Sequence, residues 1–370
     1  MNNFPILAVA ACLSFAAAEV RAQAPATPAV DRTAATRRAV RATPLTVPKP
    51  GPEPKPIQPT TTEIRDRNAR LQIFLDRQQF APGKIDGSWG LIAQRAWTRY
   101  QQARGQAPVD PIAAPPADVL AITPLYISYT VTAADATLVG EIAGSLADKA
   151  KMKMLPYTSL SAMVSERYHC SPDFLKRINP GLNIERLKVG STLNVPDVIP
   201  FDLVTLRTER GLTPQSTQTS NTVVPVPGQP PLTNAERYNL RVSLAEKLLE
   251  IREGTRLVAS FPVTPGSEKL PTPAGSWFIQ SKVFLPEFRW DEAMLNTGKR
   301  SEQFYLLPPG PNNPVGVMWM GINKDGIGLH GTNNPNTIGR AASHGCMRLA
   351  NWDAVRVAAY VEKGTHVLIE

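Results

Sequence analysis

The most constraining feature of this 370-residue chain is a change of hydrophobic pattern near residue 235. From there on, apolar side chains such as Leu240 and Val242 alternate with polar ones, which is the period of a β-strand with one buried face. The pair Glu253-Gly254 separates two such runs and suits a hairpin turn. The sequence therefore predicts a mostly-β domain over residues 235–370.

The chain is longer than one compact domain usually needs, and its hydrophobic content of 42% is sufficient for more than one core. Upstream of the β pattern, Leu71 and Phe74 fall at helical spacing, and Asp86-Gly87 supplies a turn before a second helical stripe. These features predict a small helical domain over residues 61–106.

A second patterned segment covers residues 126–198. It begins with a strand around Tyr129, continues with an amphipathic helix that carries Met163, and ends with a strand that starts at Thr192. Asn179 and the proline and glycine after it end another helix between them. We therefore expect an α+β module with the order strand-helix-helix-strand and a long segment between the first strand and the first helix.

The amino terminus has the composition of an export signal. An apolar run from Phe4 to Ala18 is followed by small residues near Ala22, and the run is too short to span a bilayer comfortably. Residues 1–22 are predicted to be a signal peptide, which places the mature chain in the periplasm or the cell wall without a transmembrane segment. Lipid anchoring through Cys12 is the alternative.

Residues 23–60 form a proline-rich basic stretch with few large apolar side chains, which is typical of an extended linker. The net charge of +9 favours partners that carry carboxylates or phosphates. Outside this linker no basic run is interleaved with aromatic residues, so the sequence argues against a nucleic-acid partner.

One glycine-rich segment, GLHGTNNPNTIGRAASHGCMRLANWD, holds two of the four histidines and one of the three cysteines. Cys346 is a candidate nucleophile, and thiol chemistry needs a nearby base and donors for an oxyanion. The N–H groups around Gly345 and Cys346 are candidate oxyanion donors. His330 and His344 are both candidate bases, and spacing alone does not choose between them.

Two other interpretations of the cysteines and histidines compete with catalysis. A zinc ion could be held by His330, His344 and Cys346, although no H-E-x-x-H motif occurs in the chain. Cys170 and Cys346 could form a disulfide in an oxidising compartment. Thiol catalysis itself requires neither a metal nor an organic cofactor, and we expect none.

The segment resembles the active-site signature of the L,D-transpeptidase family, in which H-G-T, a glycine, S-H-G-C-x-R and a downstream acid occur in this order. An upstream T-P-A-G turn followed by an aromatic residue also matches. The resemblance implies a β-sandwich-like catalytic domain over residues 235–370. The matching residues are His330, Gly331, Thr332, Gly339, Ser343, His344, Gly345, Cys346, Arg348 and Asp353, with Thr272–Gly275 and Trp277 upstream.

This resemblance implies a cysteine-dependent acyl transfer on peptidoglycan stem peptides. Cys346 would attack the carbonyl of the L-centre of a diamino acid and release the terminal D-alanine, with His330 as proton donor and acceptor. His344 would orient the site or serve as an alternative base. Arg348 would meet a substrate carboxylate or brace the loop. Gly331, Thr332 and Ser343 are expected beside the substrate.

The two upstream modules resemble wall-binding modules. Residues 61–106 resemble the helical peptidoglycan-binding domain through Leu75, Gly83, the run Ile85-Asp86-Gly87, Gly90 and Ala96, and residues 126–198 resemble a lysin motif that binds glycan strands. The expected acceptor stays open among the amine of a second stem, water, which would make the enzyme an L,D-carboxypeptidase, and a lipoprotein lysine. A catalytically inactive wall-binding protein is the alternative from another class.

Overall fold

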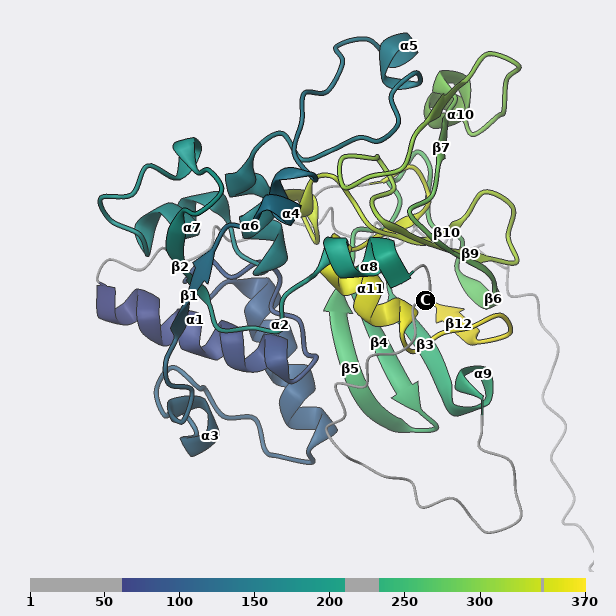
Figure 1. Ribbon diagram of the computed structural model, residues 1–370. Coiled ribbons are helices and arrows are strands. Elements are labelled where there is room, and N and C mark those ends of the chain that lie inside the picture. The colour runs from purple at the N-terminus through teal and green to yellow at the C-terminus, as the bar shows by residue number, and fades with distance from the viewer. Residues whose placement is uncertain (1–61, 210–232, 341–342) are drawn as a thin grey trace, which may run out of the picture. The chain divides into compact units, whose positions relative to one another are not determined.

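The computed structural model describes residues 62–209, 233–340 and 343–370 (Figure 1). These residues lie within one packed unit that spans Pro52–Glu370. The predicted export signal and linker fall outside the described residues. None of the helices in the described ranges has the length and apolar character needed to cross a bilayer.

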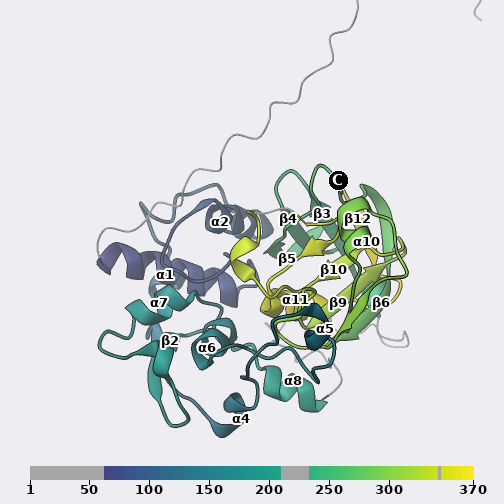
Figure 2. The same cartoon turned by 90° about the horizontal axis from the view of Figure 1, so that it is seen from above.

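The carboxyl-terminal part of the chain forms an eight-stranded sheet (Figures 1 and 2). Its strands are β3 (Tyr238–Ser243), β4 (Leu248–Glu253), β5 (Arg256–Pro262), β6 (Gly275–Phe284), β9 (Met318–Ile322), β10 (Gly328–His330), β11 (Met347–Arg348) and β12 (His366–Ile369). The strand order is β11-β10-β9-β6-β12-β3-β4-β5, and only the pairs β10–β11 and β3–β12 are parallel. The prediction of a mostly-β domain is confirmed.

The sheet buries one face by curling. Phe261 of β5 and Met347 of β11 belong to the same apolar cluster although these strands stand at opposite ends of the strand order. The helix α11 (Asn351–Ala358) adds Ala354 and Val357 to that cluster. A twisted sheet can close around a core in this way, so the sandwich-like form expected from the sequence is a single curled sheet.

The residues between β6 and β9 leave the large sheet and build a two-stranded ladder. In it β7 (Phe288–Trp290) pairs antiparallel with β8 (Tyr305–Leu307), and α10 (Glu292–Thr297) lies between them in sequence. Asp291 caps α10 by accepting a hydrogen bond from the Met294 amide at 3.1 Å, which satisfies one of the free N–H groups at the helix start.

The helical pattern near the amino terminus forms α1 (Thr62–Arg77), α2 (Leu91–Ala103) and α3 (Ala117–Leu120). Phe74 of α1 packs edge-on against Tyr100 of α2, with ring centroids 5.0 Å apart. Gly87 lies in the turn between α1 and α2 with φ +73°, and a Cβ there would lie 2.5 Å from the Arg65 side chain. Glycine is therefore required at this turn.

The next module is bounded by the strands β1 (Tyr126–Thr130) and β2 (Thr192–Pro196), with short helices between them. β1 pairs antiparallel with β2, and Ser171 caps α7 by accepting a hydrogen bond from the Phe174 amide at 3.1 Å. The elements are β1 (Tyr126–Thr130), α4 (Ala133–Ala136), α5 (Leu146–Lys149), α6 (Leu160–Arg167), α7 (Pro172–Arg177), η1 (Ile184–Arg186), β2 (Thr192–Pro196) and α8 (Leu203–Glu209), while α9 (Asn234–Arg237) precedes β3.

The long segment between β1 and the helix α6 docks on the carboxyl-terminal β domain. The Leu155 amide donates to the Pro309 carbonyl at 2.8 Å, and the Leu155 carbonyl accepts from the Asn312 amide at 3.2 Å. Gly310 lies so close that a Cβ there would be 2.3 Å from the Leu155 carbonyl oxygen. This segment therefore holds the loop between β8 and β9.

A second apolar cluster crosses all three parts of the chain. It joins Ile73 of α1 and Phe174 of α7 to Val317, beside β9, and Trp352 of α11. Burial of such side chains contributes about 1.5–3 kcal/mol each. The two upstream modules and the β domain therefore share a core.

Charged side chains reinforce these contacts. Asp76 of α1 accepts two hydrogen bonds from Arg356 of α11, at 2.9 and 2.7 Å, and its carboxylate also lies 3.0 Å from Nδ1 of His169. Burial alone would raise the pKa of Asp76, but the Arg356 charge and the contact with His169 hold that pKa well below its usual range.

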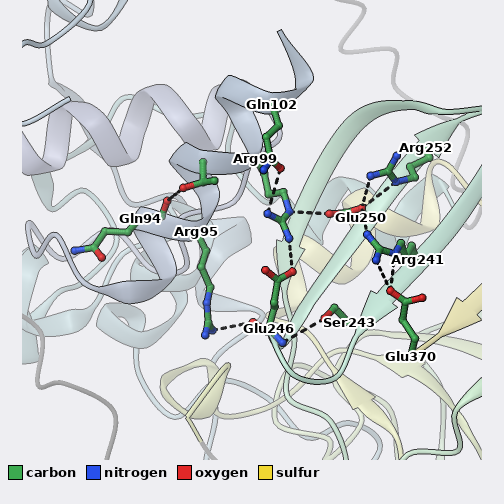
Figure 3. A network of polar contacts seen from close by, with 11 residues as sticks. Gln94, Arg95, Arg99, Gln102, Arg241, Ser243, Glu246, Glu250, Arg252 and Glu370 are labelled. Atoms are coloured by element: carbon green, nitrogen blue, oxygen red, sulfur yellow. Dashed lines mark hydrogen bonds and ion pairs between the residues drawn. The ribbon is translucent and has the colours of Figure 1, made fainter. Parts of the chain in front are cut away.

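A further ion network joins α2 to the strands of the sheet. Arg99 contacts both Glu246 and Glu250, and Glu250 also meets Arg252 and Arg241 (Figure 3). Arg241 in turn pairs with Glu370. The network therefore attaches α2 to the strand β4 and to the turn between β3 and β4.

Candidate active site

The signature residues meet at the β10–β11 edge of the sheet. In the parallel register His330 stands beside Arg348, so these two side chains point to one face, and Cys346 lies in the bend directly before β11. Trp319 of β9 lies opposite His330 on the same face. The other face carries fully buried core residues, namely Met320, Leu329 and Met347.

Cys346 is a half-buried free thiol whose S–H donates to the carbonyl oxygen of Gly326 at 3.4 Å. Burial raises the pKa of this thiol to about 11, although a hydrogen bond from the Gly328 backbone and the Arg348 charge both lower it. In this structure burial outweighs the positive field, so the resting group is a neutral thiol.

His330 is 5% exposed and stacks on Trp319, with ring centroids 5.6 Å apart. Its Nδ1 lies 2.6 Å from the Gly331 carbonyl oxygen, which can only accept, so Nδ1 carries the proton and Nε2 keeps its lone pair. Burial lowers the pKa of His330 to about 4, and the Arg348 charge acts in the same direction. No hydrogen bond joins His330 to Cys346 in the described residues.

Residues 344–346 form a bend and do not belong to a strand. Gly345 has φ +106°, a left-handed value that favours glycine, and β11 begins only at Met347. His344 is exposed, and its Nδ1 lies 3.5 Å from the Arg348 guanidinium. Burial and that charge lower the pKa of His344. The extended-strand geometry that would put His344 beside the thiol is therefore not present.

Three residues expected beside the substrate are buried and engaged within the protein. The Ser343 hydroxyl donates to the Cys346 carbonyl, and the Thr332 hydroxyl accepts from the Asn334 amide at 3.2 Å. Gly331 is buried and packs against Asn351. The Ser343 and Thr332 hydroxyls therefore brace the backbone around Cys346 and His330, and substrate contact by these residues stays a prediction.

Arg348 remains available for a charged partner. Within the ranges that the structure describes it forms no ion pair, and its nearest polar neighbour is His344. An arginine without an acid beside it, next to a nucleophile, is suited to binding a carboxylate in two-point geometry.

The structure adds Asn351, which the sequence analysis missed. Its Oδ1 accepts hydrogen bonds from the amides of Val317 at 3.1 Å and Thr332 at 3.2 Å, so it fixes the turn that follows His330. Its Nδ2 donates to Glu166 at 3.0 Å. The available sequence signal was a polar residue between Arg348 and Asp353, at the start of a predicted helix. Its partner Glu166 lies in α6, far away in the sequence, and could not be predicted.

The loop between the two halves of the signature is braced from the amino-terminal side. Lys84 donates to the Asn336 side chain at 2.6 Å, and a Cβ on Gly339 would lie 3.1 Å from Ile92 of α2. Lys247 also donates to the Gly339 carbonyl at 3.1 Å. This loop therefore has partners in both the helical module and the sheet.

Neither competing interpretation of the cysteines matches the geometry. Cys170 and Cys346 are both free thiols, and Cys170 is buried beside Ile85. Across the described residues, no three His, Cys, Asp or Glu side chains are arranged to hold a metal ion. We therefore propose neither a disulfide nor a zinc site.

Comparison with known proteins identifies the class. Residues 237–369 match the YkuD family model, which is the L,D-transpeptidase catalytic domain. The chain is 33% identical over 195 residues to YkuD of Bacillus licheniformis, covering 53% of this chain and 84% of that protein. It is 30% identical over 156 residues to YkuD of Bacillus subtilis, covering 42% and 79%. Both relatives are named as L,D-transpeptidases.

Solved structures from the same class also match over part of the chain. An L,D-transpeptidase from Mycobacterium smegmatis matches with a TM-score of 0.30 at 18% identity, over 36% of this chain and 58% of that one. The catalytic domain of an Enterococcus faecium L,D-transpeptidase matches with a TM-score of 0.29 at 21% identity, over 36% and 98%.

The mostly-β domain at the carboxyl end is thus an L,D-transpeptidase catalytic domain. Because the match to the Bacillus proteins covers most of their length, this chain belongs to the L,D-transpeptidase family. The family predicted from the signature is confirmed.

Proposed function

We propose that this protein is an exported, cysteine-dependent L,D-transpeptidase that acts on tetrapeptide stems of peptidoglycan. The observation that carries the proposal is the β10–β11 edge, where His330 stands beside Arg348 and Cys346 directly precedes β11. A thiol, a base with a lowered pKa and a cation lie at this edge of the sheet, next to the left-handed bend at Gly345. Acyl transfer requires these parts.

In the first step the Cys346 sulfur attacks the carbonyl carbon of the L-centre in the donor stem. Because thiol and imidazole are both neutral at rest, the S–H proton passes to Nε2 of His330 as the C–S bond forms. The thiol must turn from the Gly326 carbonyl toward the imidazole when the stem enters. The oxyanion would be met by the N–H groups around Gly345 and Cys346.

In the second step the tetrahedral intermediate collapses, the C–N bond breaks, and the His330 imidazolium gives its proton to the departing amine of D-alanine. A thioester remains on Cys346. An acceptor amine then attacks the thioester, His330 takes the amine proton, and the thiol is regenerated when the C–S bond breaks. Arg348 would bind a carboxylate of the stem, and His344 would help to orient Arg348.

The two upstream modules would bring the enzyme to the wall. We propose that residues 61–106 and 126–198 contact peptidoglycan and its glycan strands, which requires export to the periplasm or the cell wall. An amine of a second stem makes the product a cross-link. A lipoprotein lysine would make it an anchored protein, and water would make the enzyme a carboxypeptidase.

The test is mass analysis of products from purified disaccharide-tetrapeptide stems. We expect wild-type protein to give dimers and free D-alanine, and Cys346→Ala to give neither. Cys170→Ala is the matched control, because it removes the other free thiol of the described residues, which is buried, and it should keep activity. Tripeptide without dimer would indicate carboxypeptidase action instead.

Unchanged stems with both proteins would point to a wall-binding protein without catalysis. Incubation with a carbapenem separates these cases, because the strained lactam is an acyl donor that needs no acceptor. An adduct on Cys346 in wild type, absent in Cys346→Ala, would show a working nucleophile. No adduct together with unchanged stems would refute the proposal.

A further inference from the structure

Glu166 is a buried carboxyl outside the catalytic domain. It lies near the end of α6 and is 7% exposed. The Tyr157 hydroxyl donates to its Oε2, and the Asn351 side-chain amide donates to its Oε1 at 3.0 Å. Within the described residues no cation pairs with it, and burial raises its pKa to about 7. Burying a carboxyl without a paired cation costs free energy, so Glu166 at this position is not explained by a gain in stability.

Asn351 connects Glu166 to the backbone of the catalytic domain. Its side-chain amide has a donating end and an accepting end. Because Glu166 accepts from Nδ2, Oδ1 faces the amides of Val317 and Thr332. The reversed orientation would point NH₂ at two N–H donors and leave all of them unpaired, which is costly in a buried place.

The turn that Asn351 holds is the one that orients His330. A Cβ on Gly331 would lie 2.1 Å from Asn351 Oδ1, so the amide packs directly on this backbone. The Gly331 carbonyl in turn accepts from Nδ1 of His330 at 2.6 Å. Hydrogen bonds and close packing therefore connect Glu166 continuously to the imidazole.

We propose that Glu166 is a positioning residue for His330. Its carboxyl, supplied by the lysin-motif-like module, orients the Asn351 amide, which holds the Gly331–Thr332 turn and with it the imidazole that serves Cys346. This inference rests on the proposed function for the role of His330. It assigns to the upstream module a part in the catalytic geometry, beyond wall binding.

The test compares Glu166→Met with Glu166→Gln in the full-length protein. The two side chains are similar in length, but only glutamine keeps an oxygen that can accept from Asn351. We expect Glu166→Met to lower kcat for dimer formation by about tenfold or more, because misplacement of a catalytic group is costly. KM for the stem should change by less than about twofold. Glu166→Gln should stay within about twofold of wild type in both.

Amide hydrogen exchange gives a readout that needs no substrate. In Glu166→Met the amides of Val317 and Thr332 should exchange about tenfold faster or more, because a lost hydrogen bond of about 1.4 kcal/mol corresponds to that factor. In Glu166→Gln they should exchange as in wild type. If the wild-type protein forms no product, the proposed function fails, but this exchange result still decides whether Glu166 holds the turn.

Arg99→Gln is the matched control. It breaks another contact between an upstream helix and the sheet, through Glu246 and Glu250, with no connection to His330 (Figure 3). It should lower stability and leave kcat and the Thr332 amide unchanged. Equal loss of kcat in Arg99→Gln and Glu166→Met would overturn the proposal, because it would show a general effect of docking.

Unchanged kcat and unchanged exchange in a folded Glu166→Met protein would also overturn it. If that variant does not fold, Glu166→Asp replaces it. Its carboxyl ends one methylene short of Asn351, so the proposal requires the same loss of kcat and the same faster exchange at Thr332. Wild-type values in Glu166→Asp would refute it.

Discussion

The buried pair between Asp76 and Arg356 offers a quantitative test of how the modules are joined. Asp76 is fully buried in α1, and the Arg356 side chain in α11 is 12% exposed. Removing one member of a buried, hydrogen-bonded pair leaves a charge without compensation, which typically costs about 3–5 kcal/mol.

The neighbouring Asp353 reduces the expected cost. Its Oδ1 lies 3.5 Å from Arg356, and burial, with the charge of Asp76 acting in the same direction, raises its pKa to about 7. Without Asp76 that pKa falls, so Asp353 ionises and takes over part of the pairing. We therefore expect Asp76→Leu to lower the free energy of unfolding by about 3 kcal/mol at pH 7.5, at the low end of the range.

The assay is urea unfolding followed by tryptophan fluorescence and circular dichroism. Because the modules share a core, both probes should report one transition. In the double variant Asp76→Leu with Arg356→Met, apolar side chains replace both charges, and the loss should be smaller than the sum of the single losses by about 1–2 kcal/mol or more.

The sign of the pH dependence follows from the lowered pKa of Asp76. Its contribution is present above the unfolded pKa of about 3.9 and is lost as the pH falls below that value. Asp76→Leu and wild type should thus converge in stability toward acid pH. The exposed pair of Arg300 and Asp325 is the control, and Asp325→Ala should cause no measurable change.

Strictly additive losses in the double variant, or single losses below about 1 kcal/mol, would refute this account of the pair. Two separate transitions would refute the shared core.

Three further outcomes follow from the site. The rate at which a neutral acyl donor modifies Cys346 should be flat from about pH 5 to 9 and fall only near pH 4, where His330 gains a proton; a bell-shaped profile centred near neutrality would indicate a thiolate–imidazolium pair instead. Gly331→Ala should lower thermal stability and activity together, because its Cβ would lie 2.1 Å from Asn351 Oδ1, and an unchanged melting temperature would contradict that contact. The catalytic domain expressed alone should aggregate or bind an apolar dye, because Trp352, which is 2% exposed, packs against residues of the upstream modules, and a monomeric, dye-free fragment would contradict the shared core.

Much of the fold could be predicted from sequence because its signals are local. The alternation through Leu240 and Val242 predicted β3, and the spacing of Leu71 and Phe74 predicted α1. The signature likewise predicted that His330 and Cys346 lie at one site, and in the structure β10 ends at His330 and pairs with β11, which begins directly after Cys346.

The remaining features depend on contacts between distant segments. The neutral state of Cys346 results from burial, which no spacing reveals. Asn351 acquires its role only because Glu166 lies beside it in space, 185 positions away in sequence. Ser343 and Thr332 are expected beside the substrate because they belong to the signature, but the hydrogen bonds of their hydroxyls to nearby backbone groups could be found only in the structure.

The apolar cluster that joins the modules also has a consequence for comparing genomes. Val317 lies directly before β9 and Trp352 lies in α11, and both pack against the upstream modules. In a catalytic domain that stands alone we expect polar side chains at these two positions, because an exposed apolar patch promotes association. The residue types there should therefore sort family members into docked and free-standing architectures from the catalytic domain's sequence alone, before any upstream domain is recognised.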